Sequence, residues 1–338
     1  MAPASAPDST QSPYEDTSTP PLAPRHAYLL LLLTPYALTR LALAVSVLFA
    51  YLLLLLVLQR RRPAPGADAD VPRFRAYPFL LRASRGAAHL VLAALGLKLR
   101  VSGGEHVAGA YSGKTATVVV ANHVSYLDVF VVAATVGPYF PVMRADMGTW
   151  PVFGALLRLW GAQGVDRSKA GKAAGGASVA QLIADRARRT DRWARHPPLL
   201  VFPEGTCTTG TSPLLCFKPG GFVAGVPVLP LCIVYSTGAT NVGWVWRDRP
   251  TRVWPLSSWP LDLVHLVRLL LQPGKEVHAI VLPPYTPSPV EQADATLFAA
   301  NVRKAMAAAM HLPTTDVGSM DDARAFYAQR NPDYAKSA

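Results

Sequence analysis

Thr115-Ala-Thr-Val-Val-Val-Ala-Asn-His-Val-Ser-Tyr-Leu-Asp128 is the stretch that decides the fold, and the apolar run Val129–Val136 follows it directly. Residues Thr115–Ala121 are rich in β-branched side chains and predict a buried strand. The polar segment after Ala121 ends that strand, and Val129–Val136 predicts a helix. A strand followed at once by a helix is the repeating unit of α/β folds with a parallel sheet.

Strands and helices continue to alternate from Leu97 onward. We expect strands at Leu97–Val101, Thr115–Ala121, Phe140–Met143, Ala162–Val165, Leu199–Phe202, Val228–Tyr235 and Val277–Leu282. We expect helices between them at Val129–Val136, Trp150–Leu159 and Ser178–Arg189. This alternation predicts an α/β domain with a mostly parallel sheet flanked by helices.

The last helix is indicated by its start signals. Ser288 is expected to be the N-cap, Pro289 the first helical residue, and Glu291 the partner that completes a capping box. We expect this helix to run to about His311.

The composition excludes several classes of protein. Of 338 residues, 51% are hydrophobic and 16% charged, so the chain has ample apolar surface to bury and is not disordered throughout. The apolar runs are confined to the N-terminal third, which argues against a polytopic transporter. The net charge of +12 fits anionic lipid, phosphate-bearing substrates or nucleic acid. The odd number of cysteines, without C-x-x-C spacing, indicates neither a disulfide framework nor a zinc site.

A membrane anchor is predicted near the N-terminus. Leu41–Leu58 contains only one clearly polar residue, Ser46, and a helix of this length nearly crosses a hydrocarbon core of about 30 Å. The shorter apolar run Tyr28–Leu33 is separated from it by Pro35 and Arg40. Two arrangements stay open: one spanning helix from Leu41 with Arg40 snorkelling at its edge, or a re-entrant pair of short helices.

The charges beside the anchor predict its orientation. Arg60, Arg61 and Arg62 follow the apolar run, against Arg25 and His26 before it, which favours a cytosolic position for everything downstream. We therefore expect a membrane protein with its α/β domain facing the cytosol, and we expect the membrane to be that of the endoplasmic reticulum. The expected division is a disordered tail (1–25), an anchor (26–62), a linker with an interfacial helix (63–96), the α/β domain (97–312) and a C-terminal tail (313–338).

His123 and Asp128 are the candidate catalytic pair. His123 lies at the exit of a predicted strand, where ligand clefts form in α/β sheets. The Ser125-x-x-Asp128 pattern predicts a capping box at the start of the next helix. An Asp in that first turn can reach the imidazole, and an Asp-oriented neutral His is the arrangement of a general base that acts on a hydroxyl.

Four sequence blocks together resemble the glycerolipid acyltransferase family. Asn122–Asp128 resembles its H-x-x-x-x-D block and Phe202-Pro-Glu-Gly-Thr206 its F-P-E-G-T block. Gly164–Arg167 and Val228–Pro230 resemble the other two blocks, in the family's order, over about residues 98–235.

The sequence after the F-P-E-G-T block resembles the lysophosphatidylcholine and lysophosphatidylethanolamine acyltransferase branch. The similar residues are Cys207-Thr208, Phe217-Lys-Pro-Gly220 and Phe222. Thr209-Gly210 departs from that branch, which has Asn and then a basic or polar residue, and no EF-hand pattern follows the domain. The resemblance implies transfer of a fatty acyl group from acyl-CoA, a co-substrate, to a lysophospholipid at the bilayer. It implies no metal and no other cofactor.

Further site residues follow from the resemblance and from the chemistry of phosphate. Arg167 is expected to bind the lysophospholipid phosphate, because a guanidinium donates two hydrogen bonds at once. Arg144 and Lys218 are weaker candidates for acceptor or CoA phosphates. The resemblance gives Glu204 a contact with the acceptor's glycerol, while Gly205 and Thr206 complete that substrate-binding block, Gly205 by allowing close backbone approach.

Other functions fit the sequence less well. A lysophosphatidic acid acyltransferase would use the same mechanism, and a catalytically inactive membrane scaffold would keep only the fold. A serine hydrolase would need G-x-S-x-G, which the sequence lacks. We do not expect nucleic acid as a partner, since the positive charge is spread along the chain and an apolar anchor precedes the domain.

Overall fold

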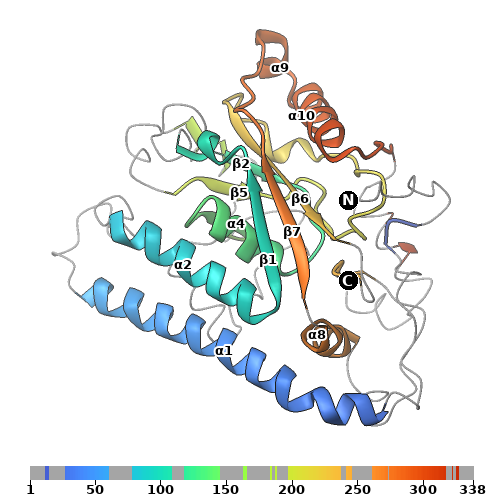
Figure 1. Ribbon diagram of the computed structural model, residues 1–338. Coiled ribbons are helices and arrows are strands. Elements are labelled where there is room, and N and C mark those ends of the chain that lie inside the picture. The colour runs from blue at the N-terminus through green and yellow to red at the C-terminus, as the bar shows by residue number, and fades with distance from the viewer. Residues whose placement is uncertain are drawn as a thin grey trace.

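The computed structural model describes the parts of the chain that build the sheet, its covering helices and the loops between them. These are residues 12–14, 27–60, 78–108, 118–144, 163–165, 183–184, 187–188, 197–236, 241–245, 261–272, 274–316, 322 and 325–326. Within them, helix α1 (Ala27–Arg60) and helix α2 (Pro78–Ala94) precede the first strand, as Figure 1 shows.

A seven-stranded sheet forms the centre of the domain, in the order β1-β7-β6-β2-β5-β3-β4. Its strands are β1 (Leu97–Ser102), β2 (Val118–Ala121), β3 (Phe140–Arg144), β4 (Gln163–Val165), β5 (Leu199–Val201), β6 (Val228–Tyr235) and β7 (Lys275–Val281). Every neighbouring pair is parallel except β6 and β7, which are antiparallel. The predicted strands and the mostly parallel sheet are therefore confirmed.

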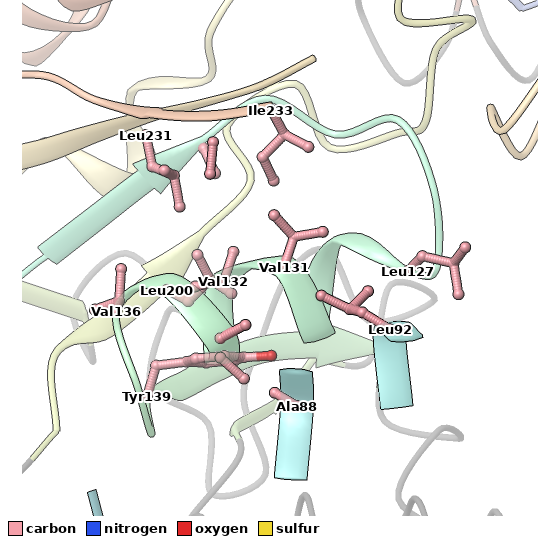
Figure 2. Close-up of a cluster of buried hydrophobic side chains, with 14 of the residues drawn as sticks. Ala88, Leu92, Leu127, Val131, Val132, Val136, Tyr139, Leu200, Leu231 and Ile233 are labelled. Carbon is pink, nitrogen blue, oxygen red and sulfur yellow. The ribbon is translucent and has the colours of Figure 1, made fainter. Parts of the chain in front are cut away.

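The side chains of β2 alternate between two hydrophobic cores. Val119 and Ala121 point into a core shared with α2 and α4 (Asp128–Thr135), whereas Val118 and Val120 point into a core shared with α10 (Ala295–Met310). Figure 2 shows α4 between the β6 residues Leu231 and Ile233 and residues of α2. Burial of each such aliphatic side chain contributes about 1.5–3 kcal/mol, so β2 and the start of α4 are held firmly.

The segment predicted as the anchor forms one continuous helix, which differs from both arrangements that the sequence left open. Helix α1 has 34 residues and runs through Pro35 without a break. At 1.5 Å per residue it is about 51 Å long. Its segment Leu32–Val57 has a mean hydropathy of 2.5, so by length and composition it could cross a membrane.

The prediction that Arg40 snorkels to a membrane edge is wrong. The side chain is 6% exposed and binds the carboxyl ends of two other helices. Its Nε donates to the Ala94 carbonyl at 2.9 Å, and its Nη1 donates to those of Leu270 and Gln272 at 2.6 Å each. The last carbonyls of a helix lack partners within it and attract a cation, so Arg40 joins α1 to α2 and α8 (Leu261–Leu271).

The helices after the anchor show three further differences from the sequence predictions. Helix α8 was not predicted, because it lies within a stretch rich in proline and tryptophan. The last predicted helix is two helices, α9 (Pro289–Ala293) and α10, since Asp294 leaves the helical conformation and caps α10. The Ser288 and Glu291 capping box is confirmed. Of the predicted Ser178–Arg189 helix only four residues are described, all helical, and Trp150–Leu159 lies outside the described residues.

Short segments of both expected tails pack on the domain. The Pro13 carbonyl accepts a hydrogen bond from the Thr209 N–H at 3.1 Å, and Tyr14, 3% exposed, packs with Leu215. The expected disordered tail therefore does not include residues 12–14. Beyond the expected boundary at 312, the chain pairs with Leu214 through Thr314.

Gly96 tests the link between Arg40 and the helix ends. It has a φ of +77°, and a Cβ there would overlap the Arg40 guanidinium. We expect Gly96→Ala to destabilise the fold by roughly 2–4 kcal/mol. Gly86→Ala is the matched control, because it lies within α2 with no atom within 4 Å of its Cβ, and it should stabilise by up to about 1 kcal/mol. Thermal unfolding measures both, and equal melting temperatures would contradict the Arg40 link.

Candidate active site

His123 and Asp128 meet at the carboxyl edge of the parallel strands. His123 Nδ1 lies 2.9 Å from Asp128 Oδ2. The Asp128 side chain is 0% exposed, while that of His123 keeps 21% of its surface. Because Nδ1 faces a carboxylate, Nδ1 carries the proton of the neutral ring and Nε2 is the basic nitrogen. The contact that the sequence predicted is present, in the form a general base requires.

The Asp128 carboxylate is surrounded by donors. Oδ2 also accepts the backbone N–H groups of Val124 at 2.7 Å and Ser125 at 2.9 Å, and Oδ1 accepts the Tyr235 hydroxyl at 2.7 Å. Asp128 is the first residue of α4, where the helix dipole favours negative charge. A buried carboxylate with these four partners is compensated and fixed in orientation.

The predicted capping box at Ser125 forms only in part. The Ser125 N–H donates to Asp128 as such a box requires, but the Ser125 hydroxyl accepts from Leu127 N at 3.3 Å. The N-cap of α4 is Leu127, which makes no side-chain capping bond. The start of α4 therefore depends on the Asp128 carboxylate more than on the serine.

The backbone of the loop His123–Ser125 has all its polar groups bonded. Its three N–H groups are bound by the carboxylates of Glu204 and Asp128. The carbonyl of His123 accepts from Thr208 N at 3.0 Å, that of Val124 from Trp244 N at 2.8 Å, and that of Ser125 from Asp128 N at 3.1 Å. The imidazole is thus mounted on a rigid loop.

Glu204, which follows β5 by three residues, supports this loop. Its side chain is 1% exposed, and its two carboxylate oxygens accept from His123 N at 2.8 Å and Leu215 N at 3.3 Å. Burial raises the pKa of Glu204 to about 7, although both N–H groups oppose that shift. The resemblance implies that Glu204 contacts the glycerol of the substrate. Its burial and its backbone partners on both oxygens favour a supporting role instead.

The environment of the imidazole adjusts both its orientation and its pKa. The ring stacks on Phe202 with centroids 4.2 Å apart. Burial disfavours the charged ring, but Cys207 and Asp128 outweigh that effect and raise the pKa of His123 well above its usual value. Asn122 ties the loop to β6, where it exchanges hydrogen bonds of 2.9 and 2.7 Å with the backbone of Ile233.

Of the remaining predicted site residues, the structure describes some and not others. Gly205 has a φ of +72°, and the Lys218 side chain lies where its Cβ would be, so this cation covers the loop after β5. Thr206 is half-buried in that loop. Arg144 ends β3 at the same edge of the sheet, although its side chain is not described. Arg167 lies outside the described residues.

Tyr235, Thr208 and Trp244 also belong to this site, and sequence reasoning did not assign them a part in it. Tyr235 ends β6, which lies next to β2 in the sheet, so its hydroxyl approaches Asp128 across 107 residues of sequence. Predicting the contact of Tyr235 with Asp128 would have required the order of the strands, and no local sequence pattern indicates which strands are neighbours.

The comparisons with known proteins agree with the motifs. Residues 98–234 match the model of the family described as Acyltransferase. The chain is 34% identical over 241 residues to lysophospholipid acyltransferase LPCAT4 of Homo sapiens, which covers 70% of this chain and 41% of that protein. It is 33% identical over 217 residues to lysophospholipid acyltransferase LPEAT1 of Arabidopsis thaliana, covering 63% and 49% respectively. The chain thus spans less than half the length of these relatives.

A solved structure has the same fold. The crystal structure of the 1-acyl-sn-glycerophosphate acyltransferase PlsC from Thermotoga maritima aligns with a TM-score of 0.55 and 17% identity. The alignment covers 85% of this chain and 95% of that one. The expected acyltransferase-like α/β fold is therefore confirmed.

Glu204→Ala tests the support of the loop that carries His123. It would leave two buried N–H groups without partners, at about 1–3 kcal/mol each, so we expect a loss of roughly 2–4 kcal/mol in the free energy of unfolding. Glu276→Ala is the control, because its exposed ion pair with Arg100 should contribute at most about 1 kcal/mol. Denaturant unfolding compares the two variants, and a Glu204→Ala loss as small as that of Glu276→Ala would disprove the supporting role.

Proposed function

We propose, on the premise that residues 98–234 carry an acyltransferase domain, that this chain acylates the free hydroxyl of a lysophospholipid with acyl-CoA as donor. The observation that carries the proposal is the 2.9 Å contact between His123 Nδ1 and the buried Asp128. It leaves the other ring nitrogen as a base at the edge of the sheet. Lysophosphatidylcholine and lysophosphatidylethanolamine are the favoured acceptors.

In the proposed mechanism His123 removes the proton from the acceptor hydroxyl. The oxygen attacks the thioester carbonyl, the C–O bond forms, and the tetrahedral intermediate collapses with cleavage of the C–S bond. The imidazolium then gives its proton to the departing CoA thiolate. Asp128 holds the ring tautomer and stabilises the transient imidazolium, and base catalysis of this kind contributes roughly 10²–10⁴-fold.

Basic residues around the same edge would bind the phosphates of both substrates. Arg167, two residues after β4, is proposed for the lysophospholipid phosphate. Arg144 at the end of β3 and Lys218 over the loop after β5 are proposed for acceptor or CoA phosphates. Strands β3, β4 and β5, which these three residues end or follow in the sequence, run parallel to β2.

The names of the relatives support the choice of acceptor. One is named lysophosphatidylcholine acyltransferase 1, in Danio rerio, at 34% identity over 237 residues. Acylation of lysophosphatidic acid would use the same His123 and Asp128, and only an acceptor comparison separates the two reactions. The hydrogen bonds that hold the backbone of the loop His123–Ser125 favour a working enzyme over a catalytically inactive scaffold.

Helix α1 supports a location at a membrane, which we propose is that of the endoplasmic reticulum, with the domain on the cytosolic side. Arg40, Ala44 and Tyr51 face the domain, and α1 lies alongside α2 (Figure 1). The opposite face is apolar and exposed: Leu32, Leu38, Leu43, Val45, Phe49, Leu53, Leu56 and Val57. Since α2 and α8 pack along α1, we propose that it lies in the plane of one leaflet.

Turnover by the His123→Ala variant tests the reaction. We expect a loss of at least about a hundredfold in kcat, since the base is removed, with the fold and membrane binding retained. His278→Ala is the control, because that histidine bonds Ser102 on the exposed part of β1 and β7. The assay measures acyl transfer to lysophospholipids that differ in headgroup. Unchanged turnover in His123→Ala would exclude the mechanism, and product from lysophosphatidic acid alone would replace the favoured acceptors.

The proposed membrane face is tested by charge. Phe49→Glu with Leu53→Glu places two carboxylates on the exposed side of α1 and should lower partitioning into anionic phospholipid vesicles by more than about tenfold. Val290→Glu is the control, since Val290 is 65% exposed on α9, at the other end of the molecule from α1 (Figure 1). Vesicle flotation measures the bound fraction, and equal flotation of all three proteins would argue against this face.

A further inference from the structure

The second oxygen of the Asp128 carboxylate is held by a residue far away in the sequence. Oδ2 accepts hydrogen bonds from the His123 ring nitrogen and from two backbone N–H groups. Oδ1 accepts one from the hydroxyl of Tyr235 at 2.7 Å. Asp128 is fully buried, so an unbonded Oδ1 would be costly. The Tyr235 bond also opposes partial rotation of the carboxylate about its Cβ–Cγ bond, which would misalign the hydrogen bond to His123.

Tyr235 is suited to this part by its position and by its protonation. It is the last residue of β6, whose Ile233 exchanges two hydrogen bonds with Asn122, the residue before His123. Both ends of the contact are therefore fixed to the sheet. Burial and the adjacent Asp128 raise the pKa of Tyr235 well above its usual value, so the hydroxyl stays protonated and acts as a donor.

We propose that Tyr235 is a positioning residue for the acyl transfer, which sets the orientation of the Asp128 carboxylate and the strength of its contact with His123. This inference rests on the proposed function. When the hydroxyl donates to Oδ1 it withdraws part of the carboxylate's charge. Without that bond Asp128 would attract the imidazolium more strongly, and the neutral base would form only at higher pH.

The other ionisable groups around the three residues are the same with or without the Tyr235 hydroxyl. Cys207 and Glu204, from the loop after β5, lie near His123. Tyr126, from the loop before α4, lies near Tyr235, and Tyr139, from the segment between α4 and β3, lies near Asp128. A change in the titration of His123 on loss of the hydroxyl is therefore assigned to the Tyr235 bond.

Tyr235→Phe tests the proposal, with Tyr139→Phe as the matched control. Tyr139 is 1% exposed and Tyr235 is half-buried, but the Tyr139 hydroxyl donates to the Val129 carbonyl of α4 at 2.8 Å and not to Asp128. In Tyr235→Phe we expect kcat to fall roughly tenfold with the KM for acyl-CoA unchanged. The acid limb of the pH profile should move upward by about half to one unit. Tyr139→Phe should keep the wild-type profile. Superimposable profiles and equal kcat values for the two variants would overturn the proposal.

A second measurement does not depend on turnover. Diethyl pyrocarbonate modifies a histidine only in its neutral form, so the pH dependence of His123 modification, followed by mass spectrometry of its peptide, gives the titration of His123 directly. The midpoint should rise in Tyr235→Phe and stay unchanged in Tyr139→Phe; an unchanged midpoint in both would refute the coupling. If wild-type protein transfers no acyl group but the midpoint still moves, the proposed function fails and the coupling stands.

A fluorinated tyrosine at position 235 covers the case in which Tyr235→Phe does not fold. This residue keeps the shape of the tyrosine side chain, and its more acidic hydroxyl donates a stronger hydrogen bond to Asp128. The His123 midpoint should then move downward, opposite to the direction expected for Tyr235→Phe. A midpoint equal to that of the wild type would count against the proposal.

Discussion

The burial of one carboxylate constrains the whole active site. Asp128 has no exposed surface, and an isolated charge there would cost several kcal/mol. Four donors offset that cost, and they come from an imidazole, two backbone N–H groups and a phenol. The same partners that make the charge tolerable also fix the orientation of the carboxylate, so the stability and the geometry of the candidate site depend on one set of contacts.

The order of the strands makes this arrangement possible. Strand β2 lies between β6 and β5, and all three are parallel, so the residues at their carboxyl ends meet. His123 follows β2, Tyr235 ends β6, and Glu204 follows β5. The loop that carries His123 is therefore held from both neighbouring strands, which limits the motion of the imidazole.

Helix α1 is connected to the candidate site through α2. A long apolar helix could be an independent anchor, but Arg40 binds carbonyls of α2 and α8, and Tyr51 hydrogen-bonds Ser84 of α2. Helix α2 in turn packs on α4, the helix that begins at Asp128. The exposed apolar face of α1 is thus connected to the buried Asp128 through two helix contacts, so with α1 in one leaflet, as proposed, the site would lie at a fixed distance from the membrane.

The sequence determined what depends on neighbours along the chain. The β-branched runs of strands such as β2, the Ser288 capping box, and the contact of His123 with Asp128 five residues later were all predictable, because backbone periodicity and helix geometry set them. Only the tertiary structure decided the partners of Arg40, the burial of Glu204 and the bond from Tyr235 to Asp128. These contacts join residues 54 to 232 positions apart, or depend on which strands lie side by side. Local propensity carries no information about either, since the partners are chosen by the packing of the complete sheet and its helices.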